Sequence, residues 1–249
     1  MILHDKKLVF IHVPKTGGMS LSRFLEPYCD KDSLKFSPYD ENGNQHARIV
    51  DYVEAYGENI LENYTFFSIS RNPFDRALSI ALHQNNNVFD REFFKEVATW
   101  HSASRLGIPP HSHFYFYMKK RLLGTVDVCS GRLIPVPGNE EGIMISFPPM
   151  DNIANYHWYR NKIQCPHILR FENYVSDVSS FFDRHNIKYS YDDLKKKTNA
   201  TDHKHYSYYY QELEIIKIKH YCALDLQMFG YQYEDKREFN STTREEIYK

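Results

Sequence analysis

A lysine and two glycines stand close to the amino terminus, in residues 14–18 (Pro-Lys-Thr-Gly-Gly). An apolar run at residues 8–13 precedes them, and the residues that follow have the apolar spacing of a helix. A strand, a glycine turn and a helix start together suit an anion, because successive backbone N–H groups and the helix amino terminus carry partial positive charge. Lys15 adds a full positive charge. The pattern therefore predicts a binding site for a phosphate-like group.

A second group of chemical interest begins at Arg71, directly after the apolar run 64–70. Ser79 follows eight residues later, inside a helix predicted over 74–83 from the Asn-Pro pair that precedes it. An arginine offers a rigid fork of donors to a phosphate, and a serine hydroxyl adds one more. The alternative is that Arg71 pairs with a carboxylate and Ser79 is a small packing residue.

The first motif differs from a Walker A sequence, because its lysine precedes the glycines. Two other functions stay open on these residues. One is a nucleotide kinase that uses the same turn with ATP and Mg²⁺, and the other is a non-catalytic module that binds a sulfated or phosphorylated ligand. Asp75 and Arg76, which lie within the second motif, are interpreted as structural or solvated.

The composition is that of an ordinary globular protein, with 249 residues, 42% hydrophobic and 25% charged. The net charge of −1 argues against a general nucleic-acid binder. Four cysteines occur without any C-x-x-C pair, which disfavours a zinc site or a disulfide framework and fits a reducing compartment. Charged residues near the amino terminus and the lack of an apolar stretch of about 18 residues predict a cytoplasmic protein without a membrane span.

Two kinds of element alternate along the chain. Strands are expected at 8–13, 64–70 and 167–171 (the last preceded by Ile163), a hairpin around 137–139, and helices at 18–25, 46–62, 74–83, 90–100, 112–123, 174–186 and 208–229. This alternation predicts one domain over 1–249, a three-layer, P-loop-like α/β fold with a central, mainly parallel sheet flanked by helices. In such sheets ligands bind at the carboxyl ends of the strands, where both motifs fall.

Together the two motifs resemble those of the sulfotransferases that use 3′-phosphoadenosine 5′-phosphosulfate (PAPS), and of the carbohydrate group (sulfotransferase family 2) in particular. That group carries P-K-[TS]-x-[GS]-[TS] at the first site and R-[DEN]-P-x-x-R-x-x-S at the second. This chain has Pro-Lys-Thr-Gly-Gly-Met-Ser at 14–20 and Arg-Asn-Pro-Phe-Asp-Arg-Ala-Leu-Ser at 71–79. The later segment 169–173, an Asn-Ala-Thr stretch and a terminal helix ending in Phe-Gly-Tyr also look like the group.

The resemblance implies transfer of a sulfuryl group from PAPS to an acceptor hydroxyl by in-line displacement, without a metal ion. Lys15 would stabilise the charge that develops on the leaving group, adenosine 3′,5′-bisphosphate. The 5′-phosphosulfate would be bound by Lys15, Thr16, Gly17, Gly18, Met19 and Ser20, and the 3′-phosphate by Arg71 and Ser79. Met19 stands where many members have a hydroxyl residue, so only its backbone N–H serves.

An acceptor hydroxyl needs a base, and histidine suits this role because its usual pKa lies near 6.5. We choose His46, because family members carry a catalytic His or Glu between the two PAPS motifs. The alternative is a histidine that starts a helix or packs in the core. Thirteen histidines make chance placement a serious rival, and His203 with His205 would form a metal site only with a third ligand.

The acceptor side is the least defined part of the sequence. Residues 84–160 are expected to hold insertions that bind the acceptor, with His111 and His113 lining its cleft. Glu172 is either an ion-pair partner or a contact to the acceptor. A solvated loop or a flap over the nucleotide is expected at 195–204, with Lys197 or Lys204 near a phosphate. The tail 234–249 is expected to fray.

The partner that the resemblance favours is a glycan, and a small hydroxylated natural product or a tyrosine hydroxyl is the alternative acceptor. No nucleic acid is expected to bind, and no membrane span is expected. The sequence does not indicate an oligomeric state.

Overall fold

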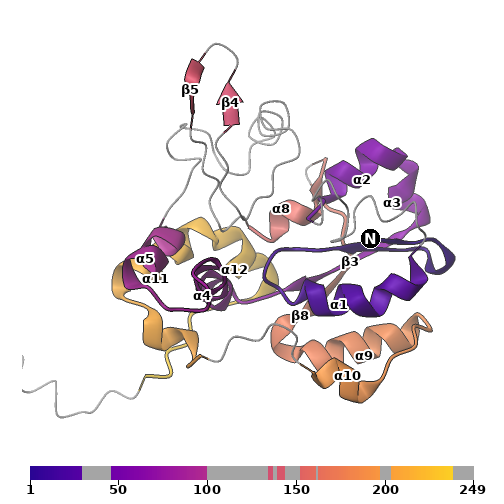
Figure 1. The fold of residues 1–249 in the computed structure, drawn as a ribbon. Coiled ribbons are helices and arrows are strands. Elements are labelled where there is room, and N and C mark those ends of the chain that lie inside the picture. Colours follow the sequence, from indigo (N-terminus) through magenta and orange to yellow (C-terminus); the bar gives the residue numbers. More distant parts are fainter. Residues whose placement is uncertain are drawn as a thin grey trace, which may run out of the picture.

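The computed structural model describes residues 1–29, 46–99, 134–136, 139–143, 152–160, 162–196 and 203–237. A four-stranded sheet lies between helices in the order β1-β2-β3-β8 (Figure 1). Its strands are β1 (Ile2–Leu3), β2 (Leu8–Ile11), β3 (Thr65–Ser70) and β8 (His167–Arg170). β1 pairs with β2 antiparallel, whereas β2 pairs with β3 and β3 with β8 in parallel. The carboxyl ends of β2, β3 and β8 therefore share one edge.

Alternate side chains of β2 and β3 enter two separate cores, because successive residues of a strand point to opposite faces. On one face Phe10 and Phe67 pack against α1 (Gly18–Leu25) and α9 (Tyr174–Arg184). On the other face Val9 and Phe66 pack against α2 (Ile49–Tyr56), α3 (Asn59–Asn63) and α8 (Ala154–His157). Every β2 residue is buried as a result.

A third core lies beyond the carboxyl edge of the sheet and is built from helices alone. It joins α4 (Pro73–Gln84), α5 (Arg91–Thr99), η5 (Tyr206–Tyr209), α11 (Glu212–Tyr221) and α12 (Ala223–Phe229). α4 starts directly after β3, and the Asn72 side chain caps it by accepting the Phe74 N–H at 3.0 Å. α4 therefore begins at the carboxyl end of β3, which is the sheet edge where the anion site was predicted.

Several sequence predictions are confirmed within the described residues. The helices expected at 18–25, 74–83, 90–100 and 174–186 correspond to α1, α4, α5 and α9. Three of the four strands of the central sheet, β2, β3 and β8, fall where strands were expected. The hairpin expected near 137–139 is the antiparallel pair β4 (Ile134–Val136) and β5 (Asn139–Ile143). The helix expected at 112–123 lies outside the described residues.

The single helix expected over 46–62 is wrong. α2 begins at Ile49 and ends at Tyr56, and α3 starts at Asn59. Gly57 lies between them with a φ of +79°, and its N–H closes α2 on the Val53 carbonyl at 2.8 Å. Glycine adopts this backbone without the penalty that other residues suffer, so the chain turns there.

The single helix expected over 208–229 is also wrong. The chain forms η5, then α11, and then α12 after a break at Cys222 (φ −101°, ψ 20°). Three apolar side chains that keep helical spacing in this stretch, Leu213, Ile216 and Met228, are exposed. The buried residues of α11 are Glu214 and Ile218. The charge of Glu214 is tolerated there because Arg91 of α5 pairs with its carboxylate at 2.8 Å.

Smaller elements complete the chain. They are the ribbon β6 (Trp158–Tyr159) with β7 (Lys162–Ile163), the helix α10 (Tyr191–Lys195), and the short 3₁₀ turns η1 (His4–Lys6), η2 (Glu26–Tyr28) and η4 (Phe171–Asn173). Ile163 thus belongs to a separate ribbon and not to the strand at 167–170. Residues 234–237, placed in a frayed tail by the sequence, form hydrogen bonds, among them Glu234 N–H to Tyr206 Oη at 2.9 Å.

The structure supports a mixed α/β fold with a central, mostly parallel sheet flanked by helices. Its P-loop-like character stays a prediction. No helix within the described part of the chain combines the length and apolar character needed to cross a membrane.

Candidate functional site

Residues 14–20, called the anion loop here, connect β2 to α1 at the carboxyl edge of the sheet. Two of its residues have left-handed backbone, Lys15 with φ +63° and Gly17 with φ +88°. A non-glycine residue in this conformation costs roughly 1–2 kcal/mol. The first N–H groups of a helix have no partners within that helix, which makes those at the start of α1 suitable donors to an anion. The loop therefore presents the amino terminus of α1 to a ligand.

Two arginines from the β3–α4 connection hold the carbonyls of this loop. The Arg76 Nε donates to the Pro14 carbonyl at 2.9 Å, and the Arg71 Nη1 donates to the Lys15 carbonyl at 3.0 Å. Arg76 is buried to 1% exposure and Arg71 to 7%. Hydrogen bonds from a charged group contribute about 1.5–3 kcal/mol each, which offsets the cost of the Lys15 backbone.

Arg71 is fixed on three sides. Its Nε donates to the Asp75 carboxylate at 2.8 Å, and its guanidinium lies 4.2 Å from the centre of the Phe171 ring. Its Nη2 makes no hydrogen bond with the described residues, so the arginine retains donors for a ligand. The two motifs are thereby joined at one sheet edge, and the sequence interpretation of Asp75 and Arg76 as structural agrees with these contacts.

Both glycines of the loop lie against aromatic rings that leave no room for a side chain. A Cβ on Gly17 would lie 2.9 Å from Phe171 Cδ2, and a Cβ on Gly18 would lie 2.1 Å from His12 Cδ2. Phe171 comes from η4 after β8, and His12 precedes the loop itself. The helix start is therefore packed against both rings.

His46 lies directly beside His12, with ring centres 4.7 Å apart. The His46 Nδ1 is 3.0 Å from the His12 carbonyl oxygen, which only accepts, so Nδ1 carries the hydrogen of the neutral ring and Nε2 is the acceptor nitrogen. Burial, and then the neighbouring His46, lower the pKa of His12 well below its usual value. His12 is thus a neutral packing residue, and His46 is half-buried at the edge of the site.

The hydroxyl residues of the two motifs differ in their surroundings. Thr16 is fully buried and its Oγ1 donates to the Val13 carbonyl at 2.9 Å, so it closes the turn. The Ser20 N–H donates to the Gly17 carbonyl at 3.2 Å, inside the first turn of α1. Ser79 is 8% exposed on α4, and its hydroxyl has no hydrogen-bond partner among the described residues.

Glu172 fixes the position of the second motif. One carboxylate oxygen accepts the Asn72 N–H at 2.6 Å, and the other accepts the Tyr231 hydroxyl at 2.9 Å. Tyr231 also lies 2.8 Å from the Ser70 hydroxyl. Burial raises the pKa of Tyr231 above its usual value, as does Glu172. In this arrangement the carboxylate holds the backbone next to Arg71.

His83 lies on α4 four residues after Ser79, on the same side of the helix, and its side chain is exposed. Burial together with the positive charge of Lys15 lowers its pKa.

The remaining predicted site residues divide into two groups. Met19 is half-buried in the first turn of α1, and Lys204 is exposed. Lys204 comes two residues before Tyr206, whose hydroxyl accepts from the Asn72 side-chain amide at 3.4 Å. Lys197, His111 and His113 lie outside the described residues. Within the described ranges no group of three metal-ligating side chains occurs, and His203 and His205 have no third partner there.

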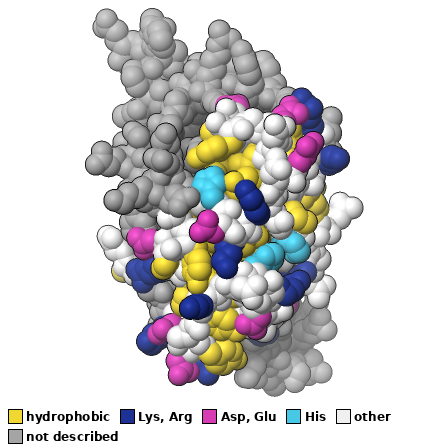
Figure 2. Space-filling model, turned by 90° about the vertical axis from the view of Figure 1, so that its right-hand side faces the viewer, with side chains coloured by type: hydrophobic (Ala, Val, Ile, Leu, Met, Phe, Trp, Pro, Cys, Tyr) yellow, Lys and Arg dark blue, Asp and Glu magenta, His cyan; other side chains and the backbone are white. Residues whose placement is uncertain are grey.

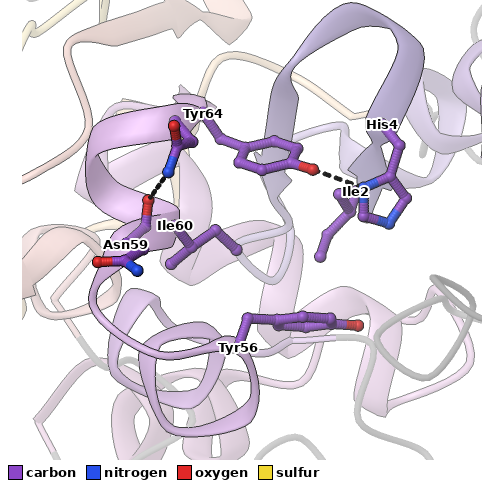
Figure 3. A pocket seen from close by; sticks show the side chains of 7 residues that line it. Ile2, His4, Tyr56, Asn59, Ile60 and Tyr64 are labelled. Atoms are coloured by element: carbon purple, nitrogen blue, oxygen red, sulfur yellow. Dashed lines mark hydrogen bonds between the residues drawn. The ribbon is translucent and has the colours of Figure 1, made fainter.

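A hollow of about 220 Å³ lies at the opposite edge of the sheet (Figure 3). Two of its side chains pair, His4 Nδ1 with the Tyr64 hydroxyl at 2.6 Å, and the Asn63 side-chain amide donates to the backbone carbonyl of Asn59 at 2.8 Å. His4 and Tyr64 stand at the amino ends of β2 and β3, so this hollow is separate from the anion loop. Figure 2 shows charged side chains of both signs interspersed over one face of the molecule.

Comparison with known proteins gives one positive result. Residues 1–107 match the family model described as "Sulfotransferase family", of the sulfotransferase family 2 group. The match covers β2, the anion loop, β3 and α4, and with them both predicted motifs. No curated protein matches the chain, and no solved structure does.

Proposed function

We propose that this protein transfers a sulfuryl group from PAPS to a glycan hydroxyl, on the premise that residues 1–107 match the sulfotransferase family model. The hydrogen bond from Arg71 Nη1 to the Lys15 carbonyl, 3.0 Å long, is the observation that carries the proposal. It joins two motifs 56 residues apart into one site. A ligand with two anionic groups, such as a 3′-phosphate and a 5′-phosphosulfate, suits such a site.

The residues present fit the donor substrate. The N–H groups of residues 17–19 and the Lys15 ammonium would bind its 5′-phosphosulfate. The Arg71 Nη2 and the Ser79 hydroxyl, which lack other partners in the described chain, would bind its 3′-phosphate. The site supplies positive charge through side chains and amides, so no metal ion is part of the proposal.

The proposed reaction is an in-line displacement at sulfur. The acceptor oxygen forms a bond to sulfur while the bond from sulfur to the bridging phosphate oxygen breaks, and that oxygen leaves with its electron pair on adenosine 3′,5′-bisphosphate. Lys15 and the loop amides stabilise its negative charge. The acceptor proton goes to His46.

His46 suits the role of base because of its tautomer. Its Nδ1–H points to the His12 carbonyl at 3.0 Å, so the lone pair that accepts a proton is on Nε2. When Nε2 takes the proton, the carbonyl stabilises the cationic ring through the same hydrogen bond. Gln at this position would keep much of the size and lose the proton acceptor.

The acceptor is proposed as a soluble glycan in the cytoplasm, with a small hydroxylated molecule as the alternative. Neutral sugar hydroxyls need a base, which His46 offers. Two other functions on the same loop are a nucleotide kinase and a non-catalytic binding module. The kinase predicts tight binding of ATP only with Mg²⁺, and the module predicts weak binding of adenosine 3′,5′-bisphosphate and no transfer.

Calorimetry with adenosine 3′,5′-bisphosphate in a chelator tests the donor site. We expect Lys15→Ala and Arg71→Ala to weaken binding by about 1.5–3 kcal/mol each, the range for hydrogen bonds to charged groups. Lys219→Ala and Arg184→Ala, at exposed positions on α11 and α9, are the matched controls. Equal affinity of all four variants would refute the donor site.

Transfer of ³⁵S from labelled PAPS to unsulfated heparan and chondroitin backbones tests the reaction. We expect His46→Gln to lose transfer while it keeps its affinity for adenosine 3′,5′-bisphosphate. Transfer that persists in this variant would remove His46 as the base. Transfer only to small hydroxylated molecules would favour the alternative acceptor.

A further inference from the structure

The corner between β8 and η4 touches both motifs of the candidate site through one aromatic ring. The centre of the Phe171 ring lies 4.2 Å from the guanidinium of Arg71, a distance at which a cation stands over the face of a ring. The Cδ2–Cε2 edge of the same ring lies against the anion loop, because a Cβ on Gly17 would be 2.9 and 3.1 Å from these two atoms. One rigid ring therefore stands between Arg71 and the loop.

The neighbouring residue ties this corner to the β3–α4 connection. One Glu172 carboxylate oxygen accepts the Asn72 N–H at 2.6 Å, and the other accepts the Tyr231 hydroxyl at 2.9 Å. Phe171 itself is half-buried against the core on the α1 and α9 side of the sheet. The ring is therefore held in place from two directions.

The ring also completes the contacts that fix the Arg71 side chain. Its Nε donates to the Asp75 carboxylate at 2.8 Å, and its Nη1 donates to the Lys15 carbonyl at 3.0 Å. The second bond draws the arginine toward the anion loop, and the Phe171 ring limits how closely it approaches. Ordering a long side chain in advance lowers the entropy that a ligand has to overcome when it binds.

We propose that Phe171 is a positioning residue that sets the spacing of the two anion sites and so makes the donor site specific for a nucleotide with a 3′-phosphate as well as a 5′-phosphate. This inference rests on the proposed function, in which Arg71 binds the 3′-phosphate. Phe171 lies outside the matched residues 1–107, so the family match does not contain this contact. Adenosine 5′-phosphate has no group for the Arg71 Nη2, and its binding gains nothing from the placement of that atom.

Two other roles of the ring make different predictions. Direct contact of Phe171 with the nucleotide base would strengthen the binding of both adenosine ligands equally. A purely structural role in the core would affect stability and leave the preference for the 3′-phosphate unchanged.

Calorimetry of the full chain with adenosine 3′,5′-bisphosphate and adenosine 5′-phosphate, in a chelator, separates these roles. The measured quantity is the ratio of the two dissociation constants. We expect the native protein to favour the bisphosphate at least about tenfold, or about 1.4 kcal/mol. Phe171→Leu keeps an apolar side chain but loses the flat ring, and should lower this ratio at least about threefold, or about 0.7 kcal/mol.

Phe24→Leu is the matched control. Phe24 is a half-buried residue of α1 that packs edge-on against Phe182 in the same core. Its substitution should keep the native ratio. If Phe171→Leu does not fold, Phe171→Met replaces it, because a flexible methionine fills the same space without a ring.

A double variant tests whether the ring acts through the arginine. In the Arg71→Ala background the ring has no guanidinium to hold. Phe171→Leu should then change the ratio by less than about twofold, or about 0.4 kcal/mol, so the two substitutions are not additive.

Four results would overturn the inference. Equal loss of affinity for both nucleotides would assign the ring to the base, and a fall of the ratio smaller than about threefold in Phe171→Leu would leave it a structural role. A full fall of the ratio in the Arg71→Ala background, or in Phe24→Leu, would show that the ring does not act by positioning Arg71. If the native protein itself favours the bisphosphate less than about tenfold, the proposed donor site is wrong, which distinguishes that failure from the others.

Discussion

Gly18→Ala is the sharpest perturbation that the structure offers. The added Cβ would lie 2.1 Å from His12 Cδ2 and 2.4 Å from His12 Nε2. Ordinary contact begins at 3.4 Å, so the first of these gaps has to open by 1.3 Å (3.4 minus 2.1). His12 is 4% exposed, stacks on Phe10, and meets the His46 ring edge-on. It has little room to retreat.

The cost follows from two opposing effects. Overpacking a buried site typically costs about 1–3 kcal/mol, whereas Ala gains up to about 1 kcal/mol over Gly within a helix. We expect a net loss of about 1–2 kcal/mol in the free energy of unfolding. Because the loop N–H groups shift with the helix start, affinity for adenosine 3′,5′-bisphosphate should fall at least about tenfold, or about 1.4 kcal/mol.

Urea unfolding and calorimetry of Gly18→Ala, His12→Ala and the double variant test this reasoning. His12→Ala removes the obstructing ring but keeps the backbone carbonyl that His46 binds. In that background Gly18→Ala should be neutral or stabilising, which gives a coupling energy of about 1–3 kcal/mol. Additive effects of the two substitutions would show that the ring does not determine the need for glycine.

Two further outcomes follow from buried groups. Arg76→Gln should lower the free energy of unfolding by about 1.5–3 kcal/mol through the lost bond to the Pro14 carbonyl, measured by urea unfolding; a change below about 0.5 kcal/mol, typical of surface sites, would contradict it. Complete burial lowers the pKa of His157 from 6.5 to about 3, so the fold favours the neutral ring, and stability is complete above pH 6.5 and falls as the pH drops toward 3. Between pH 7.5 and 5.0 the native protein should lose about 2 kcal/mol more than His157→Gln, and equal losses in both proteins would refute this.

The sequence predicts the meeting of the two motifs for a topological reason. Arg71 and the anion loop both follow parallel strands, and the carboxyl ends of parallel strands share an edge in any sheet of this kind. The hydrogen bond from Arg71 to Lys15 is one consequence of that rule. Local patterns also located α1 and α4, because their caps and apolar spacing lie within a few residues of each other.

Contacts between distant elements explain what the sequence did not predict. In α11 the side chain of Glu214 is buried while those of Leu213 and Ile216 are exposed. Arg91 of α5 neutralises the charge of Glu214 and so permits its burial. Apolar spacing along one helix carries no information about a partner on another.

Arg71 connects the geometry of the loop with the binding of its ligand. Its Nη1 holds the Lys15 carbonyl, and its Nη2 has no partner in the described chain. A phosphate bound to Nη2 would hold the guanidinium in place. The same guanidinium holds the left-handed backbone of Lys15, so ligand binding and loop order should reinforce each other. Arg76 donates to the Pro14 carbonyl, on the carbonyl side of this arrangement. The two arginines thus separate loop order from ligand contact: Arg76→Gln should weaken nucleotide binding through the loop alone, and Arg71→Ala through both.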